Sequence, residues 1–191
     1  MEDTVSGAER EALQEENDRL RREVERLDAR VAELDRVAHM DPLVPVANRR
    51  GLIRQLEIAI ARRARHMISS ALLFIDVDGL KGLNDSYGHA VGDAALRRLA
   101  EVMLTSVRRT DLVARLGGDE FAILIDHADE PSAADTAQRL ARAVDDCEFV
   151  HGGRKLPLGI AVGFTVIHGD DDPEAVLDRA DKEMYRDKAA A

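Results

Sequence analysis

A heptad repeat of leucines near the start of the chain is the feature that most restricts its fold. Leucine recurs every seven residues, at Leu13, Leu20, Leu27 and Leu34. With these leucines at heptad position d, position a holds Asn17, Val24, Val31 and Ala38. Valine at a and leucine at d favour a parallel two-stranded coiled coil, and a single asparagine at a fixes its register and dimer state. We therefore expect residues 1–40 to form a dimerisation helix.

Charged residues beside this seam support a dimer in part. Two of the three pairs between position g of one helix and position e of the other are attractive and the third is repulsive; they are Glu16–Arg21, Arg30–Asp35 and Glu23–Asp28. The alternative is one amphipathic helix packed on its own domain, which usually has a broader apolar face. At about 1.5 Å per residue the helix would be roughly 45 Å long, too long for such a small domain to cover.

Residues 41–191 read as a single domain in which helix and strand signals alternate. Pro42 and Pro45 end the heptads. The pattern predicts helices at about 48–65, 92–107, 132–146 and beyond Pro173, and strands at 70–77, 111–116, 120–125 and within 152–167. Glycines predict a loop over 79–91, and Gly117-Gly118 predicts a hairpin turn. This order favours an α+β sheet with helices packed against its faces.

Composition excludes several classes of protein. The single cysteine, Cys147, rules out an internal disulfide and fits a reducing compartment. A net charge of −10 argues against a surface that binds a nucleic-acid polymer, although metal ions can still bridge acidic side chains to a small nucleotide. No apolar run approaches the roughly 20 residues of a membrane span, and no leader opens the chain. We expect a cytoplasmic protein without a membrane partner.

Acidic residues and glycines gather in two segments, "FIDVDGLKGLNDSYGHAVGD" and "RLGGDEF". In the first, an apolar strand ends in Asp76-Val77-Asp78, and Lys81 lies in the loop that follows. If the two segments neighbour each other in one sheet, Asp76 and Asp119 converge on one cation. Carboxylates at a glycine-lined site suit Mg²⁺ completed by phosphate oxygens. Cysteine and histidine spacing does not fit zinc, and no P-loop is present, so phosphoryl or nucleotidyl transfer is the favoured chemistry.

At these residues the chain resembles the GGDEF diguanylate cyclases. The five signature letters stand at Gly117 to Phe121, and "DPLVPVANRR", "DVDGLKGLNDSYGHAVGD" and "ADKEMY" match further motifs in the same order. The resemblance implies a nucleotidyl-cyclase-like α+β fold with a mainly antiparallel central sheet. It also implies condensation of two GTP molecules into cyclic di-GMP with loss of two pyrophosphates, by a homodimer whose domains each supply half of the active site.

The resemblance also implies roles for individual residues. Two Mg²⁺ or Mn²⁺ ions per site would be held by Asp76, the Val77 carbonyl, Asp119 and Glu120. Asp119 would help to deprotonate the attacking ribose 3′-hydroxyl, and Lys81 completes the catalytic set with Asp119 and Glu120. Asn84 and Asp93 would read guanine. The remaining substrate-binding positions are Gly79, Leu80, His89, Gly118, Lys182 and Arg186. Product would bind and inhibit at Arg108, Asp111 and Arg139, the alternative for "RRTD" being a helix-end salt bridge.

Two departures from the family pattern concern loops. Val44-Pro45 stands where the family usually has Thr-Gly, and Gly79 replaces a bulkier residue; neither removes a proposed catalytic group. The main alternative function is a catalytically weak domain that binds GTP or cyclic di-GMP and signals through its coiled coil. An interaction module on an inert domain would leave the acidic residues unexplained, and mixed cyclic dinucleotides are disfavoured by Asp93.

Overall fold

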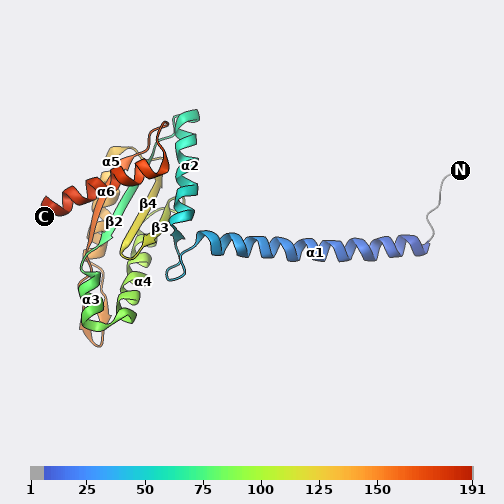
Figure 1. Ribbon diagram of the computed structural model, residues 1–191, viewed down its shortest axis with the longest axis horizontal. Coiled ribbons are helices and arrows are strands. Elements are labelled where there is room, and N and C mark those ends of the chain that lie inside the picture. Colours follow the sequence, from blue (N-terminus) through green and yellow to red (C-terminus); the bar gives the residue numbers. More distant parts are fainter. Residues whose placement is uncertain (1–6, 191) are drawn as a thin grey trace. The chain divides into compact units, whose positions relative to one another are not determined.

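The computed structural model describes residues 7–190 (Figure 1). Its elements in chain order are α1 (Gly7–His39), β1 (Ala47–Asn48), α2 (Arg49–His66), β2 (Ser70–Val77), α3 (Leu80–Tyr87), α4 (His89–Ser106), β3 (Leu112–Gly117), β4 (Glu120–Asp126), α5 (Glu130–Asp145), β5 (Val150–His151), β6 (Arg154–Lys155), β7 (Ile160–Val166) and α6 (Pro173–Ala190). The chain divides between Ala38 and His39 into two compact units. Residues 1–6 and residue 191, at the ends of the two expected domains, lie outside the described residues.

The first unit is helical over its described part, and the apolar side chains of its heptad seam are exposed to solvent in the single chain. The seam residues Leu13, Leu20, Val24, Leu27, Val31 and Leu34 are each between 48% and 65% exposed. Glutamate–arginine pairs three residues apart, such as Glu16–Arg19 at 2.7 Å, lie along the same helix and favour the helical conformation. Among residues 7–190, no helix is both long and apolar enough to cross a bilayer.

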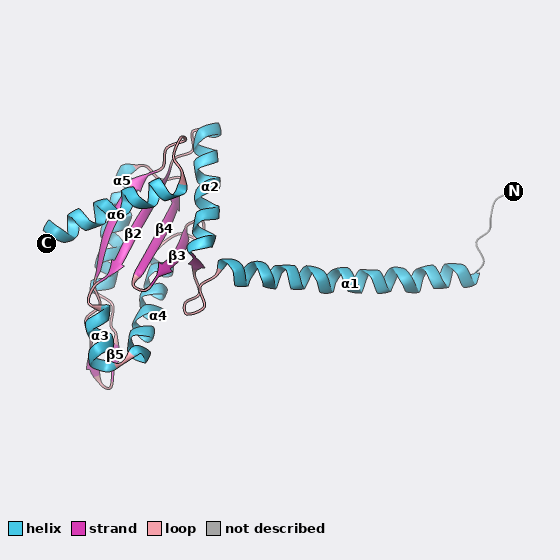
Figure 2. Cartoon of the chain, viewed as in Figure 1, coloured by secondary structure: helices cyan, strands magenta, loops and turns pink. Residues whose placement is uncertain are grey.

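The second unit contains a five-stranded sheet in the order β1-β3-β4-β2-β7 (Figure 2). Only the short β1–β3 pair is parallel. Buried side chains of α4 and α5, such as Leu99 and Leu140, pack on one face with Ile75. Side chains of α2 and α6 pack on the other face with Phe74. Because both faces are covered, β2 reads as a continuous apolar run, and the expected α+β fold is confirmed.

One expected loop is wrong. Residues 80–87 form helix α3, and α4 begins at His89 rather than near Gly92. Gly79 and Gly88 have φ angles of 69° and 85°, in the left-handed region that favours glycine, and they stand at the helix boundaries. The glycine-rich pattern therefore marks where helices start and stop. Strand β2 has the expected bounds, and α5 begins two residues early because the Asp129 side chain caps it by accepting from the Ser132 N–H at 3.0 Å.

Gly163 determines how closely α6 packs against the sheet. A Cβ atom at this position of β7 would lie 2.0 Å from the Met184 nitrogen and 2.4 Å from the Ala180 carbonyl oxygen. Only glycine therefore allows this backbone approach. The buried side chains of α6, which are Val176, Leu177, Ala180 and Met184, pack in one cluster with Leu72 and Phe74 of β2. The position of the C-terminal end of α6 thus follows from contacts made near its middle.

Candidate active site

The end of β2 and the β3–β4 turn bring the predicted acidic residues to one edge of the sheet. Strand register places Asp76 opposite Glu120. The Val77 N–H donates to the Asp119 carbonyl oxygen at 3.0 Å. The register belongs to the antiparallel β2–β4 pairing, and the hydrogen bond continues that pairing into the turn before β4, so the backbone fixes both. The structure therefore brings Asp76, Val77, Asp119 and Glu120 together, as the sequence predicts.

The glycines of this turn make room above the carboxylates. Gly118 has a φ of 50°, and the β3–β4 register shifts between Arg115 and Gly117. A Cβ atom added at Gly117 or Gly118 would meet nothing within 4 Å. The left-handed φ of Gly118 favours glycine at that position. Because neither glycine carries a side chain, the surface of the turn stays uncovered. A bound molecule can approach the turn backbone closely here.

Arg115, which the sequence analysis did not single out, holds the turn in place. Its guanidinium donates to the Gly118 carbonyl oxygen at 2.7 and 3.1 Å. It also lies 3.4 Å from the Asp41 carboxylate, and both side chains are almost buried. Asp41 in turn accepts from the backbone N–H groups of Leu43 and Val44. The opening motif of the domain is thereby connected to the residue that precedes Asp119.

Negative charge accumulates at this edge of the sheet, which carries Asp76, Asp119 and Glu120 and is called the acidic edge below. Partial burial, followed by the charges of Asp119, Asp181 and Asp76, raises the pKa of Glu120 above its ordinary value. Asp181, on α6, was not expected from the sequence. Within residues 7–190 no three carboxylate, imidazole or thiol groups already surround one metal position. The donors nevertheless suit a hard divalent cation, because backbone and phosphate oxygens can complete a shell of carboxylates.

A lysine already occupies part of this acidic edge. The Lys188 ammonium contacts the Asp76 carboxylate and lies 3.3 Å from Asp78. The two basic residues predicted from the same helix do not reach the carboxylates. Lys182 pairs with Asp178 and Arg186 with Glu183, both at 2.5 Å along exposed α6 surface. Such exposed pairs are worth about 0–1 kcal/mol, so both cations can reorient toward an anion.

A cleft beside the carboxylates has the size of a ligand site. It measures about 460 Å³ and lies between the start of α3 and the segment before β7, with Gly79, Leu80, Tyr87 and Pro157 among its lining residues. Ligand pockets commonly span about 300–1,000 Å³. The Asp78 N–H donates to the Gly159 carbonyl at 2.9 Å and closes one end.

The predicted guanine-reading residues come from two packed helices. Asn84 lies on α3 and Asp93 on α4, and both are partly buried. A Cβ atom at Gly92 would lie 2.0 Å from the Asn84 side-chain oxygen. The absence of a side chain at Gly92 therefore determines where the Asn84 amide sits. Lys81 and His89 are exposed at the starts of α3 and α4.

The predicted inhibitory residues also come together. Arg108, Asp111 and Arg139 line one cavity of about 690 Å³ between the end of α4 and the start of α5. The Asp111 carboxylate accepts from the Arg108 backbone N–H at 2.9 Å, and this hydrogen bond fixes the carboxylate against the turn between α4 and β3. Arg139 donates to the Ser106 carbonyl at 3.2 Å. Two guanidinium groups beside a fixed carboxylate can bind phosphate and guanine edges.

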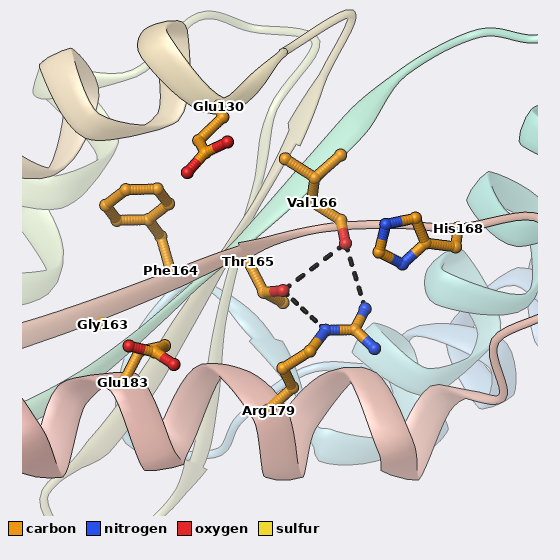
Figure 3. Close-up of a pocket in the computed structure, with 8 residues that line it drawn as sticks. All are labelled: Glu130, Gly163, Phe164, Thr165, Val166, His168, Arg179 and Glu183. Atoms are coloured by element: carbon orange, nitrogen blue, oxygen red, sulfur yellow. Dashed lines mark hydrogen bonds between the residues drawn. The ribbon is translucent and has the colours of Figure 1, made fainter.

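Another cavity, of about 420 Å³, lies at the outer edge of β7 (Figure 3). Its central side chain is Arg179, which donates to the Thr165 hydroxyl at 2.7 Å and to the Val166 carbonyl at 3.0 Å. Hydrogen bonds from this guanidinium lower the pKa of Asp171. Val166 pairs with Ala71, at the opposite end of β2 from Asp76. We interpret this cavity as part of the α6–β7 packing rather than as the reaction site.

Comparisons with known proteins identify the family to which this chain is similar. A family model described as "Diguanylate cyclase, GGDEF domain" matches residues 38–191. The chain is 41% identical over 152 residues to the probable diguanylate cyclase DgcE of Escherichia coli K12, which covers 79% of this chain. It is 32% identical over 189 residues to diguanylate cyclase DgcP of Pseudomonas aeruginosa, which covers 99% of this chain. It spans only 14% of DgcE and 28% of DgcP.

Solved structures show the same architecture. The coiled coil and GGDEF domain of DgcB from Caulobacter crescentus, in complex with c-di-GMP, matches with a TM-score of 0.85 and 26% identity. That match covers 94% of this chain and 96% of the DgcB chain. Diguanylate cyclase SiaD from Pseudomonas aeruginosa, in complex with its activator SiaC, matches with a TM-score of 0.77 and 28% identity, covering 95% and 75% of the two chains.

Proposed function

Because the chain belongs to the GGDEF-domain family of diguanylate cyclases, we propose that it condenses two GTP molecules into cyclic di-GMP and releases two pyrophosphates. The observation that carries this proposal is the meeting of Asp76, Val77, Asp119 and Glu120 at one open edge of the sheet. The glycine turn and the neighbouring cleft leave space for a triphosphate and a base beside these groups.

A divalent cation fits the donor set of this edge. Asp76, the Val77 carbonyl, Asp119 and Glu120 would hold one or two Mg²⁺ or Mn²⁺ ions. When bound, the cation supplies charge stabilisation at the phosphates and lowers the pKa of an oxygen that it contacts. The ammonium of Lys188 on Asp76 supports a cation here, because it already compensates negative charge at this edge. The raised pKa of Glu120 agrees in part, since it follows first from partial burial and then from the charges of Asp119, Asp181 and Asp76.

The chain's own residues then position the substrates and move one proton. Asp119 accepts the proton of a ribose 3′-hydroxyl as its oxygen attacks the α-phosphorus of the opposite GTP, and pyrophosphate leaves. Lys81, Lys182 and Arg186 compensate phosphate charge, and Asn84 and Asp93 bind the guanine edge. Gly79, Leu80 and Gly118 offer backbone groups, and His89 lies beside the nucleotide. Such a site acts mainly by positioning and charge stabilisation.

We further propose that the active enzyme is a dimer joined through residues 1–40, with the cyclase domain at 41–191. Each domain holds one GTP, so two domains must face each other before either 3′-hydroxyl reaches its target. The exposed leucine seam of α1 supports this assembly. A parallel coiled coil would raise the local concentration of one domain near the other and restrict their orientation.

Product identification tests the central proposal. Purified protein is incubated with Mg²⁺ and GTP, with ATP, and with both, and the products are identified by mass spectrometry. We expect cyclic di-GMP from GTP and no mixed dinucleotide. Binding of GTP or cyclic di-GMP without turnover would instead indicate the receptor alternative. Absence of cyclic di-GMP under all three conditions would reject the enzyme.

Gly92→Ala is expected to weaken GTP binding through Asn84. The added methyl group would overlap the Asn84 amide oxygen, so the amide must move away from guanine. We expect the KM for GTP to rise about tenfold, the value of a lost hydrogen bond to a polar group. Steady-state kinetics should show little further loss when Gly92→Ala is added to Asn84→Ala, because both changes remove one interaction. Additive losses would contradict this explanation.

Arg108→Ala is expected to relieve inhibition by product. Arg108 lines the cavity with Asp111 and Arg139, and its guanidinium would bind a phosphate or guanine edge. Losing such a charge-assisted contact should raise the half-inhibitory concentration of cyclic di-GMP about tenfold to a hundredfold. Initial rates without product should stay close to wild type. The matched control is Arg109→Ala, since Arg109 is exposed and lines a different cavity; equal effects of the two changes would argue against this site.

A further inference from the structure

Lys188 lies where the acidic edge would hold a cation. Its ammonium contacts an oxygen of Asp76 and lies 3.3 Å from an oxygen of Asp78. The Asp76 side chain is only 21% exposed, whereas those of Lys188 and Asp78 are 43% and 47% exposed. The least exposed of these three side chains is thus the carboxylate assigned to the metal.

The fold directs this lysine to the site. The close contact of α6 with Gly163 and the buried face of the helix set its position along β7. Residue 188 then lies near the end of β2, although it is 112 residues from Asp76 in sequence. Lys182 instead pairs with Asp178 on its own helix at 2.5 Å. Lys188 and Lys182 therefore share a helix and a charge but differ in contact with the acidic edge.

We propose that Lys188 is an internal counter-ion that occupies the divalent-cation position and is displaced when the metal binds. This inference rests on the proposed function, because it takes Asp76 as a metal ligand. Lys188 is a positioning residue in the metal-free state, because it pairs with Asp76 and Asp78. An ammonium in contact with an Asp76 oxygen and a divalent cation on that same oxygen would repel each other, so the two states exclude one another.

The first consequence concerns metal affinity. Without Lys188, nothing has to leave Asp76 before a cation binds, so Lys188→Met should bind the metal more tightly. Lys182→Met is the matched control, since it removes the same charge from the same helix without touching Asp76. The nucleotide-free dimer is titrated with Mn²⁺, and free Mn²⁺ is counted by electron paramagnetic resonance. We expect roughly threefold to tenfold tighter binding for Lys188→Met than for Lys182→Met, the range of a partly exposed ion pair.

Lys188→Arg keeps the positive charge and should bind Mn²⁺ within about twofold of wild type, because arginine can pair with the same carboxylates. Equal Mn²⁺ affinity of wild type, Lys188→Met and Lys182→Met would overturn the inference. Failure of both the wild type and Lys188→Met to bind Mn²⁺ would overturn it as well.

A second measurement uses the unaltered protein and so does not depend on how a variant folds. Amine acylation is followed residue by residue by mass spectrometry, with and without Mg²⁺. Lys188 should react severalfold faster once Mg²⁺ is present, because its ammonium is released from Asp76. Lys155, which pairs with Glu148 at 3.3 Å on the β5–β6 hairpin, serves as the internal reference and should not change. Unchanged labelling of Lys188 at saturating metal would overturn the displacement.

The two proposals fail in different ways. If the protein makes cyclic di-GMP but neither Mn²⁺ affinity nor labelling depends on Lys188, the counter-ion role fails alone. If Lys188→Met changes metal affinity as expected but GTP is not converted, the metal site stands and the cyclase activity fails.

Discussion

Asp119→Asn is expected to lower the rate of cyclic di-GMP formation by about a thousandfold, within the range for loss of a general base or metal ligand. Asparagine keeps the size of the side chain, but it removes the negative charge and accepts a proton poorly. The backbone contact between the Val77 N–H and the residue 119 carbonyl does not involve the side chain, so the turn should keep its shape. Removing one of several crowded carboxylates should also leave the fold at least as stable.

Initial rates at saturating GTP and Mg²⁺, together with thermal melting, check this prediction. Asp145→Asn is the matched control, since Asp145 is an exposed carboxylate at the end of α5. It should retain wild-type rate and stability. A variant Asp119→Asn that kept more than about a tenth of the activity would remove Asp119 from the mechanism, because general bases typically contribute 10²–10⁴-fold.

Placing glutamate at both Leu20 and Leu27 is expected to separate the dimer and, with it, the two halves of the active site. Together the two changes put four like charges, counted over two helices, into an apolar seam whose leucines are 51% and 48% exposed in the single chain. At submicromolar enzyme the specific activity should fall at least about a hundredfold, since tethering typically contributes 10²–10⁴-fold. The rate should then rise with the square of enzyme concentration.

Analytical ultracentrifugation and rates over a range of enzyme concentrations check this second prediction. The control places two glutamates on the outer face of the same helix, at Ala29 and Ala32, heptad positions f and b. This variant should stay dimeric and active. Wild-type specific activity of Leu20→Glu/Leu27→Glu at low concentration would show that the coiled coil is not needed to join the domains.

Local patterns in the sequence predicted much of the fold. The bounds of β2 and the β3–β4 hairpin were expected, because an apolar run and a Gly-Gly turn are short-range signals. Helix α3 was missed because four glycines between residues 79 and 93 resemble a loop. Two of them, Gly79 and Gly88, have left-handed φ angles at the helix ends, which composition does not reveal.

Residue types and local patterns were enough to propose Asp76 and Asp119 as metal ligands and residues 9–39 as a heptad helix. Glu120 was added as a ligand by the family resemblance. Three further residues at or beside the acidic edge were not predicted, because each acts through a contact with a distant segment of the chain. Arg115 reaches Asp41, Asp181 acts on Glu120, and Lys188 contacts Asp76. Strand register and the packing of α6 at Gly163 create these contacts between distant segments. No short-range pattern encodes them, because they arise only when the sheet and its covering helix are assembled.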